Sequence, residues 1–346
     1  MGSGGARRRS KMTEQQILAT ASAPGKVVLS GEYAVLNGAP AICMAVNRRA
    51  VVTIKSTPAE HHVVVAPGYL DEPRRFLVRN GVFGWLDSSD EYKLFEHVWR
   101  RSGLDRQHGL ELRLDTNDFL DPVRGCKTGI GSSAALSVAL ALALHELSPG
   151  DSDPVATAHQ GHLDFQGGLG SGVDIATAAV GGLVEYRMQG TSALRLPMPE
   201  GLECRLLWSG SPASTGIKLE RYSRHGPKPS KGALVVSSRR MAQAWASGSA
   251  AKVLAEYHDY ISVLQEFSTD HGLGIFDAGH DELAACAADA GMIYKPCGAG
   301  GGDIGILLSD DGARADDFIA ASLPGDFKAL DLRIDEQGAR AERVDE

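Results

Sequence analysis

The sequence predicts an α+β protein, because runs with the period of β-strands and runs with the period of helices are mixed without regular alternation. Alternating apolar and polar residues, as in GLELRLDT at 109–116, predict strands in the first part of the chain. Long helical patterns at about 236–270 and 277–291 follow later. A length of 346 residues exceeds the usual size of one simple core and predicts two domains, or one large α/β unit with an appendage.

The first elements belong mainly to a sheet. Residues 1–16 are basic and glycine-rich without an apolar core, which predicts a disordered leader. Residues 17–36 predict a strand, a Pro-Gly turn and a second strand, and 41–56 predict one or two more. Short strands are expected within 57–90. A helical period at 92–103 is closed by a glycine, and it precedes the strand at 109–116.

Three helices are expected in the middle of the chain. The first covers about 132–147, and the second begins at the Asp-Pro pair of 153–166, where aspartate caps and proline starts a helix. The third covers 173–182 and leads into a strand at 183–187. The glycine-rich stretch GGLGSG at 167–172 separates the last two helices.

A polar, proline-bearing segment at about 188–203 predicts the domain boundary. An N-terminal domain is therefore expected at 17–195 and a C-terminal domain at 196–346. The C-terminal domain is expected to hold strands at 204–210, 302–309 and 327–335, together with the long helices and a short helix around DDFIAASL.

Composition excludes several classes of protein. The net charge of −8 does not indicate a nucleic-acid-binding surface, and no apolar run approaches the length of a membrane span. Five scattered cysteines without a CxxC pair argue against a disulfide framework or a zinc cluster and favour a reducing cytoplasm. We expect neither a nucleic acid nor a membrane as partner, and a monomer and a homodimer both remain open.

The stretch KTGIGSSAA at 127–135 places glycines and serines directly before a long apolar helix. Small residues let a backbone approach a ligand closely, and the free N–H groups of a helix start attract anions. Ser132 and Ser133 would add hydroxyls for a phosphate oxygen or for magnesium. A serine that merely caps the helix explains the same letters, and this alternative stays open.

Two better-known phosphate motifs do not account for the glycines. The pattern GxxxxGK[ST] is absent from the whole chain. GGGDIG at 300–305 matches GxGxxG, but it is expected to open a strand rather than a helix, so a dinucleotide site lacks its required context.

Three stretches together resemble the three motifs of the GHMP kinase superfamily. They are SAPGKVVLSGEYAVLNG at 22–38, KTGIGSSAALSVALALA at 127–143 and KPCGAGGGDIGILL at 295–308. Further stretches, FQGGLGSGVDIATAAVGG at 165–182 and LLWSGSPASTGIKL at 206–219, are most similar to the phosphomevalonate kinases of this superfamily. Ile130 departs from the usual leucine, and the chain after 308 matches weakly.

The resemblance implies an N-terminal domain like domain 2 of ribosomal protein S5, a ferredoxin-like C-terminal domain, and an ATP cleft between them. It implies transfer of a phosphoryl group from ATP, with Mg²⁺, to the phosphate of 5-phosphomevalonate in isoprenoid biosynthesis. The alternative is a GHMP kinase that phosphorylates a hydroxyl of mevalonate or another small molecule. A related decarboxylase should carry a different acceptor loop, and a non-catalytic member should lack Lys26 or Asp174.

The resemblance also implies roles for individual residues. Lys26 and Asp174 are the expected catalytic pair, and Ser132 is the expected magnesium ligand. The expected ATP-binding residues are Lys127, Gly129, Gly131, Ser132, Ser133, Ala134, Gly298, Gly300 and Gly301. The expected acceptor-binding residues are Ser171, Gly172, Ser214, Thr215, Lys218 and Asp303.

Other side chains have weaker assignments. A phosphate acceptor needs cations, and the candidates are Arg48, Arg49, Lys218, Arg221, Arg224, Lys228 and Lys231. The basic segment 218–231 is expected to be a lid over the acceptor or a solvated loop. The resemblance implies that a side chain in this region, Asp164 or Gln166, assists magnesium. His159 and His162 lack a third ligand at metal spacing, so they are expected to be structural or solvated.

Overall fold

The structure is a computed structural model that describes residues 16–343 except 89, 107, 225 and 227, so residues 1–15 of the expected leader lie outside it. The strands are β1 (Ile17–Ser30), β2 (Ala41–Ser56), β3 (His62–Ala66), β4 (Leu70–Arg79), β5 (Val82–Trp85), β6 (Leu110–Asp115), β7 (Leu183–Arg187), β8 (Ser192–Leu196), β9 (Glu203–Trp208), β10 (Ile293–Pro296), β11 (Ile304–Ser309), β12 (Lys328–Leu330) and β13 (Arg340–Arg343). The helices are α1 (Lys93–Ser102), α2 (Ser132–Leu147), α3 (Pro154–Phe165), α4 (Val173–Val180), α5 (Thr215–Arg224), α6 (Pro229–Ala246), α7 (Ala250–Asp270), α8 (His280–Asp289) and α9 (Gly312–Ser322). Short 3₁₀ turns lie at Ala34–Asn37, Asp90–Tyr92 and Asn117–Phe119.

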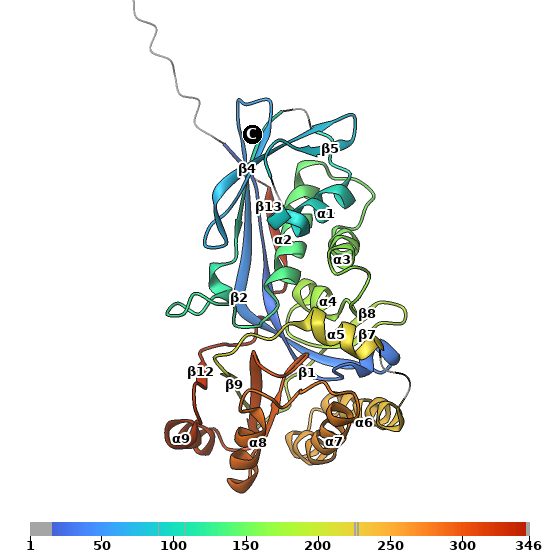
Figure 1. Cartoon of the computed structure of the whole chain (residues 1–346), viewed down its shortest axis with the longest axis vertical. Coiled ribbons are helices and arrows are strands. Elements are labelled where there is room, and N and C mark those ends of the chain that lie inside the picture. Colours follow the sequence, from blue (N-terminus) through green and yellow to red (C-terminus); the bar gives the residue numbers. More distant parts are fainter. Residues whose placement is uncertain (1–15, 89, 107, 225, 227, 344–346) are drawn as a thin grey trace, which may run out of the picture.

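Two sheets organise the described part of the chain. The larger sheet has nine strands in the order β13-β1-β2-β6-β3-β4-β5, and β7 joins it through β2 and carries β8. The smaller sheet has the order β10-β11-β9-β12. Strands β1 and β2 run along the long axis of the molecule, with α1 to α4 beside the larger sheet and α7 to α9 beside the smaller one (Figure 1). Helix α6 packs on α7 and contacts β1 and β2. The predicted α+β class is confirmed.

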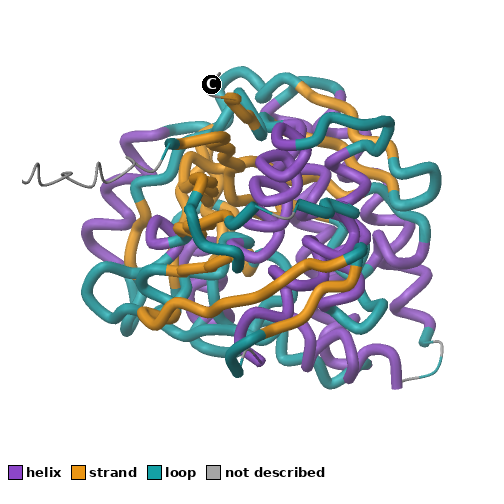
Figure 2. The backbone as a smooth tube through the Cα atoms, turned by 90° about the horizontal axis from the view of Figure 1, so that it is seen from above, coloured by secondary structure: helices purple, strands orange, loops and turns teal. Residues whose placement is uncertain are grey.

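Helix α2 forms the centre of the upper core. Its alanines are all buried and its leucines are buried or partly buried, and the helix packs on β1 and β2 and also contacts α1, α3 and α4. A helix that is apolar all round needs such burial on every side. The view from above shows a group of helices directly beside the bundled strands (Figure 2).

The predicted Pro-Gly turn at 24–25 is wrong, because β1 continues straight through Pro24 and Gly25. The ladder with β2 shifts its register there instead, from Pro24 opposite Arg49 to Gly25 opposite Val46. A Cβ at Gly25 would lie 2.7 Å from the carbonyl oxygen of Ile130, so the loop before α2 requires glycine at this point. The glycine therefore serves close packing of the backbone and not a turn.

Three further predictions of local structure are corrected. The helix expected at about 236–270 is two helices, α6 and α7, separated around Gly248, whose φ of 67° favours glycine. The segment expected as a lid or a solvated loop begins with helix α5. The strand expected at 327–335 is limited to β12, and the chain then returns to the larger sheet, where β13 pairs with β1.

Hydrogen bonds join the two halves of the chain through buried polar groups. Glu32, just after β1, accepts a hydrogen bond from Lys295 in β10 and another, at 2.6 Å, from the hydroxyl of Tyr260 in α7. The side chains of Lys295 and Glu32 are 0% and 1% exposed. Burial alone would lower the pKa of Lys295, but the attraction of Glu32 outweighs it and raises the pKa, which keeps the lysine charged.

Candidate active site

Two cavities meet at the residues that the sequence singled out. The loop cavity, about 500 Å³, is lined by residues of the glycine-rich loop before α2, and its walls include Tyr69, Leu94 and Phe95. The inner cavity, about 110 Å³, lies between β1, the start of α4 and α5. Lys26, Asp174, Gln166 and Thr215 line both. A group moving from a molecule in one cavity to a molecule in the other would pass these four side chains.

Lys26 and Asp174 form an ion pair at this junction. The Lys26 ammonium nitrogen lies 3.4 Å from a carboxylate oxygen of Asp174, and the two side chains are 11% and 31% exposed. Burial lowers the pKa of Lys26, but its attraction to Asp174 more than compensates and raises the pKa above the ordinary value. The lysine is therefore positively charged at neutral pH and places a cation at the junction of the two cavities.

The helix that follows the glycine-rich loop is not capped by serine. The N-cap of α2 is Gly131, with a φ of 83°, and no side chain of the described residues caps this end. Ser132 and Ser133 occupy the first turn and line the loop cavity. The capping alternative for the serine pair is therefore excluded. The backbone N–H groups at the start of α2 suit an anion such as a phosphate.

The glycines of this loop make room for neighbouring side chains. A Cβ at Gly129 would lie 2.3 Å from the Asp303 side chain, and one at Gly131 would lie 3.0 Å from Cε of Lys26. Lys127 reaches over the ring of Tyr69 at 5.6 Å, at the wall of the loop cavity. Ala134, in contrast, is fully buried within α2 and contributes to the core.

Ser133 and His162 connect the loop to α3. The Ser133 hydroxyl lies 3.1 Å from Nε2 of His162, which is buried and lines the inner cavity. Burial lowers the pKa of His162, although nearby Asp174 opposes this shift, so the ring is neutral at neutral pH. The solvated alternative for His162 is thus wrong. Its helix gave no sign of this contact, because the contact depends on how α3 packs against α2.

The residues fit a magnesium ion that is shared with phosphate oxygens. The described residues hold no group of three or more His, Cys, Asp and Glu side chains suited to a metal. Magnesium commonly takes one or two protein oxygens and completes its shell with phosphates and water. Ser132 faces the loop cavity and can supply such an oxygen. Asp164 is bound to Arg101, whereas Gln166 lines both cavities, which favours Gln166 as the assisting side chain.

The start of α4 forms one wall of the inner cavity. Gly172 caps this helix with a φ of 79°, and a Cβ there would lie 2.5 Å from Nε2 of His159. The Ser171 carbonyl accepts a hydrogen bond of 2.6 Å from Tyr186, which holds the turn in place. Ser171, Gly172 and Asp174 all line the inner cavity.

The expected acceptor contacts on α5 divide between the two cavities. Thr215 lines both, and Ser214 lines only the loop cavity. The Lys218 ammonium donates to the carbonyls of Leu273 and Gly274, at 2.8 and 3.0 Å, and this lysine lines neither cavity. Burial lowers the pKa of Lys218. The structure therefore gives Lys218 a role in holding α5 on the segment that follows α7.

The third glycine motif contributes less directly than expected. Gly298 borders the inner cavity, but Gly300 and Gly301 pack against the backbone of Gly274 and Ile275. Asp303 lines the loop cavity, and its carboxylate accepts a hydrogen bond of 3.0 Å from the Ala213 amide. Burial raises the pKa of Asp303. Asp303 thus lies beside the glycine-rich loop before α2 and not in the inner cavity, where an acceptor contact was expected.

The expected cluster of cations does not surround the inner cavity. Of the described residues that line this cavity, one basic side chain, Lys26, is charged at neutral pH. Arg49 bonds to the C-terminal segment, Arg221 bonds to Gly272 and Arg224 pairs with Glu220. Anion binding in this cavity would rest on Lys26, hydroxyls and the N-termini of α4 and α5.

Comparisons with known proteins agree with this architecture. Residues 92–182 match the family model described as the GHMP kinases N terminal domain. The chain is 31% identical to a phosphomevalonate kinase of Streptomyces sp. (strain CL190), over 88% of this chain and 93% of that protein. It is 28% identical to a mevalonate kinase of Pyrococcus abyssi, over 95% and 99%. The fold matches Streptococcus pneumoniae phosphomevalonate kinase in complex with phosphomevalonate and AMPPNP, with a TM-score of 0.73, 19% identity, and coverage of 91% and 99%.

Proposed function

The chain belongs to the GHMP kinase family, and from this premise we propose that it transfers the γ-phosphoryl group of ATP to the phosphate of 5-phosphomevalonate. The products are 5-diphosphomevalonate and ADP. The protein is thus a kinase, and the identity of its acceptor is the part that the proposal adds.

One observation carries the proposal: the two cavities join at Lys26 and Asp174. The loop cavity offers glycine-rich backbone and the start of α2 to a triphosphate, while Tyr69, Leu94 and Phe95 offer apolar surface to a base. The inner cavity offers room for a small acceptor. Transfer between phosphates depends mainly on positioning and on stabilising negative charge, and the junction supplies a buried cation for this purpose.

The residues of the chain have separate tasks in the proposed reaction. An oxygen of the acceptor phosphate forms a bond to the γ-phosphorus of ATP, and the bond from that phosphorus to the bridging oxygen of ADP breaks. Lys26 stabilises the charge on the oxygens of the transferred group. Asp174 holds the Lys26 ammonium in place. Ser132 would hold magnesium, which when bound neutralises part of the phosphate charge.

The ionisation of the acceptor explains why Asp174 need not act as a base. A phosphate monoester has a second pKa of about 6 and is largely dianionic at neutral pH. A hydroxyl acceptor would need help to lose its proton, and Asp174 would then have to accept it. With a phosphate acceptor, Asp174 only has to orient Lys26. With a hydroxyl acceptor, Asp174 would also have to remove a proton.

Phosphorylation of a hydroxyl is the second candidate function. The mevalonate kinase of Pyrococcus abyssi aligns with almost the whole chain at 28% identity, close to the 31% of the Streptomyces phosphomevalonate kinase. Lys26 is also the one charged basic side chain among the described residues of the inner cavity, which is a modest provision for a phosphorylated acceptor.

An acceptor screen separates the two functions. The purified full chain is incubated with ATP and Mg²⁺, and either 5-phosphomevalonate or mevalonate is added. We expect ADP release and 5-diphosphomevalonate with the phosphorylated acceptor, and less than about one hundredth of that kcat/KM with mevalonate. Turnover of mevalonate without turnover of its 5-phosphate would reverse the assignment. ADP release that is equal with and without either acceptor would refute both.

A further inference from the structure

The ladder between β1 and β2 is irregular directly beside Lys26. Pro24 pairs with Arg49 but the next residue, Gly25, pairs with Val46, so two residues of β2 bulge out of the ladder. Lys26 itself pairs with Ala45. A bulge frees backbone groups from their usual partners and re-aims the strand, so this one needs support from another part of the chain.

The C-terminal clasp, defined here as residues 333–339, supplies that support. Asn47 donates its backbone N–H to the carbonyl of Arg333 at 3.0 Å, and Asp335 donates its own to the carbonyl of Ala45 at 3.0 Å. Val46 and Ile334 form an isolated β-bridge. The clasp thus binds the backbone of β2 at the residues that lie opposite Gly25 and Lys26.

The same clasp also holds the end of α4. Ala339 donates to the carbonyl of Ala179 in the last turn of this helix, at 3.1 Å, and Gly182 donates to the carbonyl of Asp335 at 2.7 Å. A Cβ at Gly338 would lie 2.5 Å from the Ala179 carbonyl oxygen, so the two backbones are in close contact. Helix α4 spans Val173–Val180 and carries Asp174 in its first turn. Anchoring one end of so short a helix restricts the other end as well.

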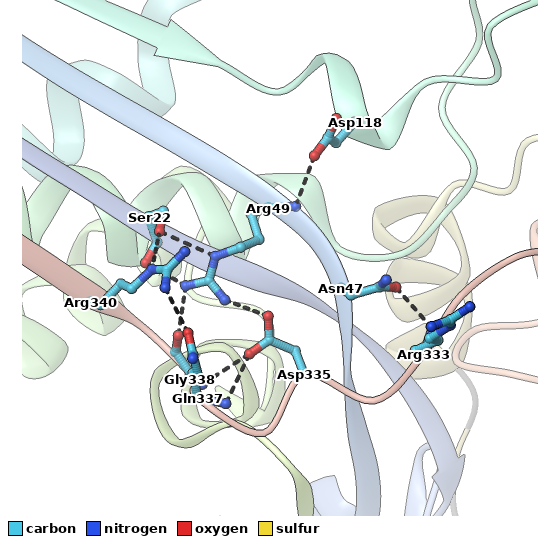
Figure 3. Close-up of polar contacts among 9 residues, drawn as sticks. All are labelled: Ser22, Asn47, Arg49, Asp118, Arg333, Asp335, Gln337, Gly338 and Arg340. Carbon is cyan, nitrogen blue, oxygen red and sulfur yellow. Dashed lines mark hydrogen bonds and ion pairs between the residues drawn. The ribbon is translucent and has the colours of Figure 1, made fainter.

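A nearly buried ion pair fastens the clasp. Arg49 pairs with Asp335, with side chains 14% and 9% exposed, and it also donates to the carbonyls of Gly338 at 2.7 Å and Ser22 at 3.1 Å. Its Nε donates to the Ser22 hydroxyl at 3.1 Å. Figure 3 shows the Arg49 guanidinium between Ser22 on β1 and the turn that contains Asp335 and Gly338. This arginine therefore joins β1, β2 and the clasp at one point.

We propose that Arg49 and Asp335 are positioning residues, which act through the C-terminal clasp to set the distance between Lys26 on β1 and Asp174 on α4. The clasp bonds to β2 opposite Lys26 and to the last turn of α4, the helix that carries Asp174. The inference rests on the proposed phosphoryl transfer, because the pair matters only if it serves the reaction. It also gives Arg49, a candidate for the acceptor phosphate in the sequence analysis, a different task.

Asp335→Asn tests the inference, since the amide can still accept from the Gln337 and Gly338 amides but no longer pairs with a charge. We expect kcat to fall at least about 10-fold with little change in either KM, because small misplacements of reacting groups cost rate. In an Asp174→Asn background the same change should cost less than about 2-fold, because its target is already lost. Arg49→Lys, which keeps the charge but loses the fork geometry, should behave like Asp335→Asn.

Arg195→Gln is the matched control, because it removes a more exposed ion pair to the same segment, with Glu336, where the side chains are 47% and 61% exposed. It should leave kcat within about 2-fold of the parent. Hydrogen exchange of residues 174–182 provides a measurement that needs no substrate, and it should accelerate in Asp335→Asn but not in the control. Any of three results would overturn the inference. They are an equal loss of kcat in both backgrounds, an unchanged kcat in folded Asp335→Asn and Arg49→Lys, and an unchanged rate of hydrogen exchange at residues 174–182 in Asp335→Asn. An inactive parent protein would instead count against the proposed function.

Discussion

At the scale of single residues, Lys26 and Asp174 are the pair on which the proposed phosphoryl transfer depends. Lys26 comes from the middle of a long strand and Asp174 from the first turn of a short helix, and their charged groups lie 3.4 Å apart. The surrounding protein raises the pKa of Lys26, so the cation needs no ligand in order to stay charged. A positive charge therefore lies between the two cavities before any ligand binds.

We expect Asp174→Asn and Lys26→Ala each to lower kcat by at least about 100-fold, because each removes a group that orders or stabilises charge in the transition state. Steady-state kinetics with the accepted substrate gives the rate, and thermal unfolding shows whether the fold is retained. Asp164→Asn is the matched control, since Asp164 has the same 31% side-chain exposure as Asp174 but pairs with Arg101. Near-normal turnover in both test variants would remove these two residues from the mechanism.

Sequence reasoning at this scale identified residue types more reliably than contacts. Lys26 and Asp174 stand in stretches whose letters resemble a known family, so their position followed without knowledge of the packing. The contact of His162 with Ser133 and the burial of Arg49 against the clasp did not follow. Both depend on which elements pack together, and a helical or strand period does not contain that information.

At the scale of elements, the loop between β6 and α2 is the proposed binding site for the phosphates of ATP. Its glycines have φ values of 64° at Gly125, 82° at Gly129 and 83° at Gly131, which favour glycine over other residues. Only some of these positions are also crowded: Gly129 lies against Asp303, whereas Gly125 has open space around it. A side chain added at Gly125 would therefore only strain the backbone, whereas one added at Gly129 would also collide with Asp303.

We expect Gly129→Ala to raise the KM for ATP at least about 10-fold, because the added methyl group collides with Asp303 and displaces the loop that lines the cavity. Gly125→Ala is the control with similar φ and no neighbour within 4 Å of the added atom. It should cost about 1 kcal/mol of stability while the KM for ATP stays within about 2-fold. Kinetics at varied ATP and urea unfolding measure the two quantities. Equal KM values in both variants would argue that the crowding at Gly129 has no part in nucleotide binding.

The elements themselves were predictable where their signals are local. The Asp-Pro start of α3, the glycine that ends α1 and the alternation in β6 all gave the observed elements. Helix α5 was missed because none of its residues is fully buried and its composition is basic, which is also typical of a solvated loop. Its place is set by Lys218 and Arg221, which donate to backbone carbonyls of the 272–274 segment.

At the scale of the whole molecule, the buried pair Glu32–Lys295 connects the strand that carries Lys26 to the smaller sheet. Tyr33 extends this connection by donating to the carbonyl of Ala299 at 2.9 Å. These contacts border the inner cavity, which is lined by Glu32, Tyr33 and Ala299. The two halves of the chain are thereby held together beside the site.

We expect Lys295→Met to lower the free energy of unfolding by about 3–5 kcal/mol, because it leaves Glu32 buried without a counter-charge. The double variant with Glu32→Gln should recover a large part of that loss. Lys93→Met serves as control, because Lys93 and Asp90 are 61% and 91% exposed, and it should change stability by less than about 1 kcal/mol. Urea unfolding monitored by intrinsic fluorescence measures all three. A single variant as stable as the control would show that the pair does not link the halves energetically.

The domain division expected at residue 196 stays a prediction, but the structure adds a feature that bears on it. The chain crosses back after β12, and β13 pairs with β1 of the larger sheet. The described residues include no helix long and apolar enough to cross a bilayer. The weakly matching end of the sequence gave no sign that it would return to the N-terminal strands.

By itself, the sequence determined the α+β class, the family and the loop that begins α2, because glycine conformation, helix starts and motif spacing are local properties of the chain. Only the tertiary structure decided which of the other cations hold the fold instead of reaching the cavities. Lys26 and Asp174 meet, and Arg49 is drawn to Asp335, through packing between segments far apart in the chain. Such pairing depends on the free energy of the whole molecule and not on the letters around any one residue.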